Sequence, residues 1–328
     1  MNEKDLRADM RFMSPTCILP FTQFFHEPQQ NRICCVSRVT DETHDQIRDN
    51  ILAGVWSRSC ASCREVESHN EISYRQRQLA QISDARARAT AIEHVEWYKR
   101  TGEVRYNNYQ ISLSNICNYA CVMCSPQVSS MIAKAKKVFP IVRNNLLPDD
   151  FIFEEKSYVA ISGGEPFLNP VYLEMMKSIP KSCNVLVTTN GSIYDQPMLD
   201  ELKKFDSYLL AVSVDGLGDV YEKIRKFGKW ETVQNNVGRF VDELEPSHIG
   251  INTVVQKQNV AQLPELAHWI HGLGIGYWQL YTVLYKPELM FSDSDITFSK
   301  EDFPKDIGFV PQTYINSLLA RKNNAQKT

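Results

Sequence analysis

Three cysteines lie within eight positions of the sequence, in the stretch NICNYACVMCS, at Cys117, Cys121 and Cys124. Structural zinc sites and most iron-sulfur clusters use four protein ligands. A group of three therefore indicates either a fourth ligand elsewhere in the chain or a metal position that stays open to a small molecule. A four-iron cluster held by three thiolates has such an open iron. Zinc with a distant fourth ligand, or a chance grouping in one loop, remains possible on spacing alone.

The other cysteines also occur mostly in groups. Of nine in the chain, seven fall in the triplet or in the pairs Cys34-Cys35 and Cys60-Cys63, while Cys17 and Cys183 stand alone. The first twenty residues lack the apolar core of a secretory signal, and no run of about eighteen apolar residues predicts a membrane span. We therefore expect a cytoplasmic protein without a membrane partner. In that reducing compartment, clustered cysteines are more often metal ligands or catalytic groups than disulfides.

Length and composition indicate a globular chain. It has 328 residues, of which 43% are hydrophobic and 10% aromatic, enough for a sizeable core. Its formal charge of -3 gives no support for nucleic-acid binding, which needs a cationic excess.

From about residue 106 the sequence alternates short apolar runs with helical patterns, which is typical of a parallel sheet with crossover helices. The predicted strands are 109–114, 158–162, 185–190, 208–214, 249–255 and 277–283. The predicted helices are 127–138, 169–179, 195–205, 218–243 with a break near Gly228, and 261–271. This pattern predicts an α/β fold, a partial (βα)6 TIM-like barrel over residues 106–290, with its active site at the carboxyl ends of the strands.

The flanking segments do not continue this pattern. Residues 1–105 form a predicted separate, cysteine-bearing module, with an apolar start (CILPFTQFF), a helix near 41–54 and a long polar helix over about 66–100. Residues 291–328 form a predicted polar tail with a short helix near 311–322. Tyr277, Tyr281, Tyr285 and Lys286, on or after the last strand, are more simply core or surface residues than substrate contacts.

The order of several motifs resembles one enzyme family. Cys-x3-Cys-x2-Cys after a first strand is similar to the signature of the radical S-adenosylmethionine (radical SAM) superfamily. Three later strands end in segments that resemble further motifs of that family, in the same order: GGEP at 163–166, TTNG at 188–191 and SVDG at 213–216. Arg225 in YEKIRKFGKW matches a common arginine of the family, and NTVV at 252–255 resembles its fifth-strand segment. Taken singly, each of these segments is equally consistent with an ordinary turn or a solvated helix residue. Their joint order favours the family.

The resemblance implies a role for each matching residue. Cys117, Cys121 and Cys124 would hold a 4Fe-4S cluster as the catalytic centre. The residues that would contact S-adenosylmethionine are Met123, Gly163, Gly164, Glu165, Pro166, Asn190, Ser213, Asp215, Arg225 and Asn252. Within this set, Glu165 would accept the methionine ammonium, and Arg225 would pair with the carboxylate. Met123 departs from the pattern, because the family often has an aromatic residue there to support the adenine.

The resemblance also implies a reaction. The reduced cluster would cleave S-adenosylmethionine, and the 5′-deoxyadenosyl radical would remove hydrogen from an unidentified peptide or small-molecule substrate. An electron donor such as flavodoxin or ferredoxin would reduce the cluster. A non-catalytic iron-sulfur or zinc protein that serves as a scaffold or recruits a partner is the alternative.

The amino-terminal cysteines form a second candidate metal site. Cys17, Cys34 or Cys35, Cys60 and Cys63 make a possible set of four ligands. The stretch GVWSRSCASCREVESHNEISYRQ resembles the twitch-type (SPASM-like) module of radical SAM proteins, a short hairpin plus helix with an auxiliary 4Fe-4S cluster, here placed before the barrel. Cys34 is preferred over Cys35 because it lies where the second hairpin strand should start. Structural zinc or no metal are the alternatives, and Cys183 is expected to be a small buried residue.

Overall fold

The computed structural model describes residues 15–28, 32–69, 73–81, 85–283, 286–306 and 309–325. Two compact units are present: unit 1 is Met1–Ile111 with Pro148–Ala160, and unit 2 is Ser112–Leu147 with Ile161–Thr328. The predicted domains divide the chain differently, at residues 105 and 290. None of the described helices combines the length and the apolarity that a membrane crossing requires.

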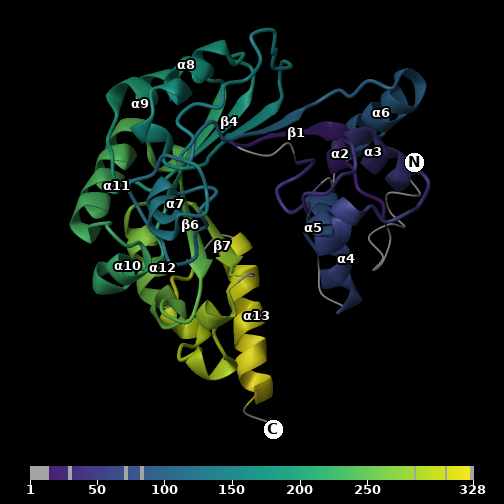
Figure 1. The fold of residues 1–328 in the computed structure, drawn as a ribbon. Helices are drawn as coiled ribbons and strands as arrows, with labels where there is room; N and C mark the ends of the chain where they lie inside the picture. Colours follow the sequence, from purple (N-terminus) through teal and green to yellow (C-terminus); the bar gives the residue numbers. More distant parts are fainter. Residues whose placement is uncertain are drawn as a thin grey trace. The chain divides into compact units, whose positions relative to one another are not determined.

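Seven strands form one sheet in which they follow chain order from β1 to β7 (Figure 1). Their bounds are β1 Gln23–His26, β2 Asn108–Ile111, β3 Tyr158–Ile161, β4 Asn184–Thr189, β5 Ser207–Ser213, β6 Ile249–Val255 and β7 Tyr277–Thr282. β1 pairs with β2, and β4 to β7 pair in sequence, all in parallel. The α/β prediction is confirmed, and the six predicted strands match β2 to β7. β1 is an additional strand.

The helices of unit 2 also follow the prediction. They are α7 Ser130–Lys136, α8 Val171–Ser178, α9 Gln196–Leu202, α10 Gly218–Ile224, α11 Trp230–Leu244, α12 Leu263–Gly272 and α13 Phe309–Ala325. In α11 the side chains at four positions of helical spacing are buried: Val233, Val237, Phe240 and Leu244. This apolar face explains why α11 packs against the sheet. α8, α9 and α11 succeed one another along the outside of the strands (Figure 1).

Short helices and the tail complete unit 2. The 3-10 helices are η2 Pro166–Leu168, η3 Pro246–His248, η4 Val260–Gln262, η5 Pro287–Leu289, η6 Asp293–Asp295 and η7 Lys300–Asp302. The predicted helix near 311–322 is longer, as α13, and lies beside β7, where the hydroxyls of Thr282 and Tyr314 are 2.8 Å apart.

Unit 1 is mainly helical. It contains α2 Leu19–Thr22, α3 His44–Leu52, η1 Arg58–Cys60, α4 Ala61–Ser68, α5 Tyr74–Gln81 and α6 Ala85–Thr101. Its core includes the buried side chains of Phe21, Ile47, Ile51 and Val95. α3 begins with a capping box, in which Thr43 and Gln46 exchange hydrogen bonds.

The predicted long helix over 66–100 is wrong. α4 ends at Ser68, and a new helix, α5, begins at Tyr74. The Ser73 hydroxyl donates to the Glu67 carboxylate over 2.6 Å, and the Ser73 amide donates to Gln76 over 2.9 Å. Ser73 therefore caps α5 and ties it back to α4, which ends the continuous helical path.

The predicted hairpin is also absent from the described part of unit 1, where β1 is the one strand before β2. Residues 32–37 instead form a local turn. Ser37 donates its amide and its hydroxyl to the Cys34 carbonyl, over 3.1 and 2.8 Å, and Arg32 donates to the Cys35 carbonyl over 3.0 Å. These bonds occupy backbone groups that a second strand would need for pairing.

Candidate functional site

The cysteine triplet lies in the loop that follows β2, within unit 2, and its three thiols are partly buried. Serines near the start of α7 hold this loop. Ser130 accepts a hydrogen bond from the Cys117 amide at 3.1 Å, and the Ser129 hydroxyl donates to the Tyr119 carbonyl over 2.7 Å. The amino end of α7 therefore fixes the loop's backbone before any metal binds.

Burial dominates the electrostatics of these thiols. It raises the pKa of Cys117 to about 12 and that of Cys121 to about 11, and it also raises the pKa of Cys124. The Arg225 guanidinium opposes this effect at Cys121 and Cys124. Without a metal the three thiols are therefore protonated at neutral pH, and each must lose its proton to become a ligand.

Arg225 links the cysteine loop to the end of β5. Its Nη1 lies 3.9 Å from Cys121 Sγ, and its Nη2 lies 2.7 Å from Asp215 Oδ2. Both side chains are buried, with exposures of 9% for Arg225 and 0% for Asp215. Arg225 Nε is buried without any hydrogen-bond partner. A buried, unpaired guanidinium N–H is the donor that a ligand carboxylate would use.

Glu165 lies in the turn after β3, where the prediction places it, and other groups of the protein hold its carboxylate. Its carboxylate accepts hydrogen bonds from the Thr189 hydroxyl at 2.6 Å, from the Asn190 amide at 2.6 Å and from the Phe167 amide at 3.1 Å. It is 1% exposed and joins the turn after β3 to the end of β4. The structure thus gives Glu165 three protein donors, and its contact with a ligand ammonium stays a prediction.

Gly164 makes room for the backbone of the cysteine loop, and Gly163 makes room for the Ser112 side chain directly after β2. Both have positive φ, 89° and 59°. A Cβ on Gly163 would lie 1.6 Å from Ser112 Oγ, and one on Gly164 would lie 2.3 Å from the Ile116 carbonyl oxygen. Larger residues therefore cannot occupy either position. Pro166 then starts η2.

Asn190 follows β4, Ser213 is the last residue of β5, and Asn252 lies in the middle of β6. Asn190 Nδ2 lies 3.9 Å from Cys117 Sγ and donates to Asn118 over 2.9 Å. Ser213 and Asn252 are register partners on β5 and β6, so their side chains point to the same face. Met123 is half-buried in the loop. The adenine and ribose contacts predicted for these residues stay predictions.

Sequence reasoning missed the roles of two site residues, one of which, Lys286, it had considered a core or surface residue. Lys286 follows β7, and its Nζ donates to the carbonyls of Val122 and Cys124, the latter over 2.9 Å. The lysine ammonium therefore binds the backbone of the cysteine loop. The buried Tyr172 hydroxyl accepts from the amides of Leu113 and Ser114 and donates to the Gly163 carbonyl over 2.8 Å. A long-range lysine-to-backbone contact leaves no sequence signal. Tyr285 lies outside the described residues.

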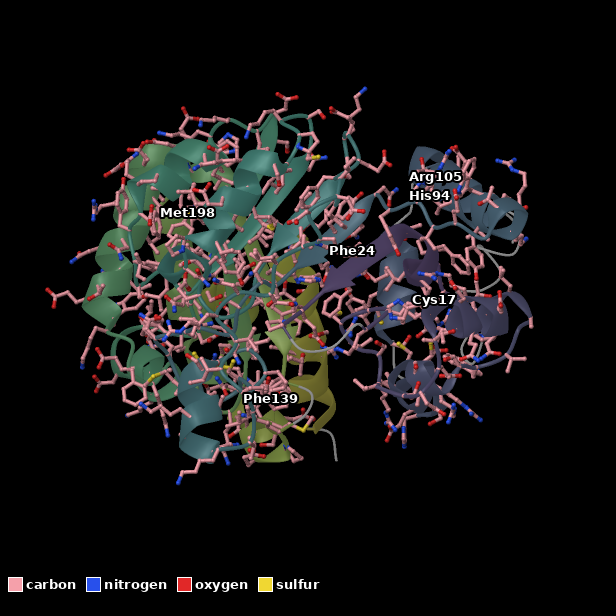
Figure 2. All side chains as sticks on the ribbon, turned by 45° about the horizontal axis from the view of Figure 1, so that its top comes forward. Cys17, Phe24, His94, Arg105, Phe139 and Met198 are labelled. Carbon is pink, nitrogen blue, oxygen red and sulfur yellow. The ribbon has the colours of Figure 1, made fainter. Side chains whose placement is uncertain are left out.

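The amino-terminal cysteines gather around one cavity in unit 1. Cys17, Cys34, Cys60 and Cys63 all line it, together with Trp56, Tyr74 and Arg75. Cys17, labelled in Figure 2, is 8% exposed. Cys35 is not part of the lining, which agrees with the preference for Cys34. The reason given for that preference, a second hairpin strand starting at Cys34, does not hold.

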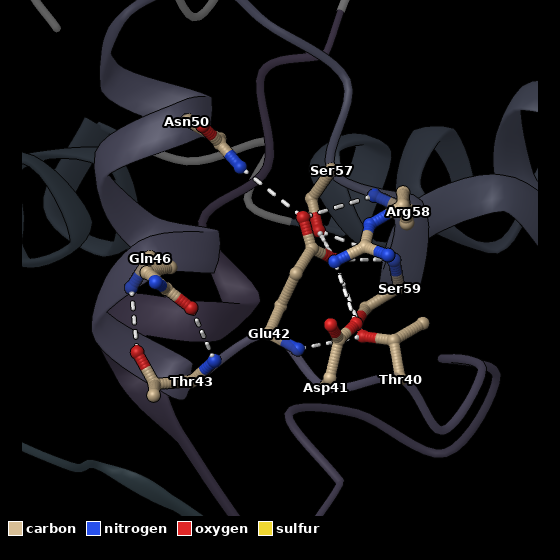
Figure 3. A network of polar contacts seen from close by, with 9 residues as sticks. All are labelled: Thr40, Asp41, Glu42, Thr43, Gln46, Asn50, Ser57, Arg58 and Ser59. Atoms are coloured by element: carbon tan, nitrogen blue, oxygen red, sulfur yellow. Dashed lines mark hydrogen bonds and ion pairs between the residues drawn. The ribbon is translucent and has the colours of Figure 1, made fainter.

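Two carboxylates anchor the segments that carry these cysteines, and the contacts of the first, Glu42, are drawn in Figure 3. Glu42 accepts from the Ser57 hydroxyl at 2.7 Å and from the Ser59 amide at 2.9 Å, directly before Cys60. Partial burial acts to raise the pKa of Glu42, but these hydrogen bonds outweigh it and lower the value to about 2. Glu67, 0% exposed, forms the second anchor with Arg75 at 2.8 Å.

The donors of both groups are thiols, which are ligands of iron-sulfur clusters and of zinc. Among the residues that the structure describes, no three His, Cys, Asp or Glu side chains converge as the ligands of a single metal ion. A four-iron cluster is wider than one ion, so its thiolates stand farther apart. Three thiols beside an unpaired guanidinium N–H, and four thiols around one cavity, are compatible with such groups.

Comparison with known proteins identifies part of the chain. The model of the Radical SAM superfamily matches residues 111–270. The probable GTP 3′,8-cyclase of Methanocaldococcus jannaschii is 26% identical over 182 residues, which cover 50% of this chain and 55% of that protein. A second relative is the tungsten-containing aldehyde ferredoxin oxidoreductase cofactor-modifying protein of Pyrococcus furiosus. It is 29% identical over 181 residues, which cover 50% of this chain and 48% of that protein. The chain spans about half the length of these relatives.

Solved structures are similar at lower identity. The match to Streptococcus suis SuiB bound to precursor peptide SuiA covers 77% of this chain and 54% of the SuiB chain, with a TM-score of 0.46 and 15% identity. Native anSMEcpe with bound AdoMet covers 57% of this chain and 56% of its own, with a TM-score of 0.43 and 17% identity.

Proposed function

Residues 111–270 of this chain form a radical SAM domain, and from this premise we propose that the chain is an enzyme that cleaves S-adenosylmethionine to abstract hydrogen from a peptide or a small molecule. Cys117, Cys121 and Cys124 would hold the 4Fe-4S cluster. When bound, the reduced cluster and S-adenosylmethionine together supply a 5′-deoxyadenosyl radical. The observation that carries the proposal is the buried Arg225, which reaches a cysteine of the triplet and keeps one N–H unpaired.

The chain's own residues would bind and orient the cofactor. Arg225 would pair its free Nε–H with the methionine carboxylate, while Asp215 neutralises its charge from the other side. Gly163 and Gly164, which let the turn after β3 lie close to Ser112 and Ile116, would hold this turn beside the cofactor. Ser213 and Asn252, neighbours on one face of β5 and β6, would offer hydrogen bonds to the nucleoside.

The cavity in unit 1 supports a second cluster. Cys17, Cys34, Cys60 and Cys63 would provide four thiolates and leave no open iron, which suits electron transfer. This module would be of the twitch-like type, and its cluster would accept an electron from the substrate.

The test uses anaerobic reconstitution with iron and sulfide. We expect about eight iron atoms per chain for two four-iron clusters. After reduction and addition of S-adenosylmethionine, mass spectrometry should detect 5′-deoxyadenosine. The triple variant C117A/C121A/C124A should keep about half of the iron and form no nucleoside.

A matched variant separates the two sites. C60A/C63A should also lose about half of the iron, but it should still form 5′-deoxyadenosine. Zinc in place of iron and sulfide at the triplet, or a fully loaded cluster that neither binds nor cleaves S-adenosylmethionine, would favour the non-catalytic scaffold instead.

A further inference from the structure

Strands β6 and β7, neighbours in the sheet (Figure 1), have one packed face and one open face. Side chains alternate between the two faces along each strand. The side chains of the packed face include four that are at most 5% exposed: Ile249, Ile251, Trp278 and Leu280. On the open face of β7, Tyr277 and Tyr281 are 41% and 48% exposed, and Gln279 between them is half-buried. The two tyrosines are therefore not core residues. We name Tyr277, Gln279 and Tyr281 the β7 row.

A glycine of β6 makes room for the first ring of the β7 row. Gly250 is the register partner of Tyr277, and a Cβ there would lie 2.6 Å from Tyr277 Cδ1. The ring therefore lies across Gly250. A glycine inside a strand often marks such a close approach of another group, and any larger residue at this position would displace the ring.

The β7 row adjoins the residues that we propose as contacts of the nucleoside. Gln279 is the register partner of Asn252, and Asn252 is the register partner of Ser213. Register partners point to the same face of a sheet, so these three side chains form one line across β5, β6 and β7. A group bound on the β7 row therefore lies beside the proposed position of the cofactor.

The strands that form this face are uncharged. β4 to β7 contain no charged residue. Partial burial and the neighbouring Tyr277 raise the pKa of Tyr281 to about 12, so its phenol is neutral at physiological pH. Two charges at the ends of the strands are already engaged, because Asp215 pairs with Arg225 at 2.7 Å. A charged substrate group on the β7 row would lose its water without meeting a counter-ion, which is costly.

We propose that the β7 row binds an uncharged aromatic group of the substrate and so determines which substrates the enzyme accepts. The inference rests on the proposed function, because the row adjoins the cofactor position of that proposal. Two accessible phenol rings offer the faces and edges with which another aromatic ring pairs. The Gln279 amide between them is polar but neutral, so it tolerates a polar substituent on the ring without selecting a charge.

The experiment measures binding of two capped tripeptides, acetyl-Gly-Tyr-Gly-amide and acetyl-Gly-Asp-Gly-amide. Saturation-transfer NMR follows each titration on anaerobically reconstituted protein with S-adenosylmethionine present. We expect the tyrosine tripeptide to bind about tenfold more tightly than the aspartate tripeptide. Tyr281→Ala should lose about this factor, whereas Tyr281→Phe keeps the ring and should retain the affinity. The control Ile141→Ala alters a side chain of unit 2 that is also 48% exposed, and it should bind like the unaltered protein.

A variant that adds a charge tests the neutrality of the row directly. Gln279→Lys places a cation between the two rings and should shift the preference toward the aspartate tripeptide. No binding of the tyrosine tripeptide, equal binding of the two peptides, or an unchanged preference in both Tyr281→Ala and Gln279→Lys would overturn the inference.

The same preparations separate this inference from the proposed function. Iron content and 5′-deoxyadenosine formation are measured beside each titration. A protein that forms 5′-deoxyadenosine but does not distinguish the peptides contradicts the assignment of the β7 row alone. A protein that holds no cluster at the triplet refutes the proposed function itself.

Discussion

Arg225 and Asp215 form a buried ion pair whose two members depend on each other. Their side chains are 9% and 0% exposed. Removing one partner of such a pair leaves an uncompensated buried charge, which typically costs about 3–5 kcal/mol. Arg225→Gln should therefore lower the free energy of unfolding by about that amount in urea titrations.

The double variant is the control for this prediction. Asp215→Asn/Arg225→Gln keeps two polar groups of similar shape and removes both charges, so much of the lost stability should return. Additive losses in the double variant would show that the pair is not coupled.

Lys286 places a positive charge beside Cys124 without belonging to any motif. Its ammonium contacts two carbonyls of the cysteine loop. Removing this cation should lower the reduction potential of the cluster, on the order of 50 mV for one electron, because the reduced cluster carries more negative charge. The measurement is a redox titration followed by electron paramagnetic resonance on Lys286→Gln. Lys300→Gln, which removes an exposed lysine of the same unit, should leave the potential where it is.

Glu42 should make the stability of unit 1 depend on pH. The pKa of this carboxyl is lowered to about 2 in the folded chain. A lowered folded-state pKa means that the carboxylate stabilises the fold above its ordinary pKa and loses this contribution as pH falls toward 2. Glu42→Gln should cost about 1–2 kcal/mol at pH 7.

The difference between Glu42→Gln and the unaltered protein should shrink as the pH of the urea titrations falls from 5 toward 2. Glu65→Gln, at a 63% exposed carboxylate paired with Arg38, should show little cost at any pH. A constant penalty across this range would contradict the proposed role of ionised Glu42.

The sequence pattern predicts the helices and strands that depend on the residues within them. β2 to β7 and α7 to α12 lie within a few residues of their predicted positions. The reason is that the spacing of apolar residues in strands and helices can be read from the sequence itself. The end of α4 is different. The 66–100 stretch is rich in helix formers, and the break between α4 and α5 is held by side-chain bonds of Ser73 and Arg75 to Glu67, which helical periodicity does not reveal. β1 was missed because its partner, β2, lies more than eighty residues away.

Arg75 is the residue that joins α4 to α5 beside the four cysteines. It is 2% exposed, binds Glu67 through Nε and Nη2, and donates to the Thr16 carbonyl over 2.9 Å. Arg75→Gln should destabilise unit 1 by about 3 kcal/mol. In the background of C117A/C121A/C124A, it should also reduce the iron retained after reconstitution.

The matched control for this variant is Arg77→Gln, on the exposed side of the same helix. It should retain both stability and iron. Equal iron in the two variants would mean that Arg75 supports α5 but not the cysteine site.

At the scale of the whole molecule, each set of cysteines lies within one compact unit. Local spacing groups the triplet and the Cys60-Cys63 pair, whereas Cys17 and Cys34 reach the same cavity only through the fold. The family resemblance predicted Asn190 and Arg225 as site residues, but their contacts with Cys117 and Cys121 come from the fold. Asn190 follows β4, Arg225 follows α10 and Lys286 follows β7, so these positions are far apart in sequence and meet at the cysteine loop.

Because the cysteine triplet is buried, assembly of a cluster at this site also requires the release of protons. In the metal-free chain the pKa of Cys117 is raised to about 12 and that of Cys121 to about 11, and Cys124 is shifted in the same direction. Each thiolate that binds iron must first release a proton to the solvent. Loading this site therefore releases protons, and we expect the iron bound at the triplet during reconstitution to increase as the pH is raised.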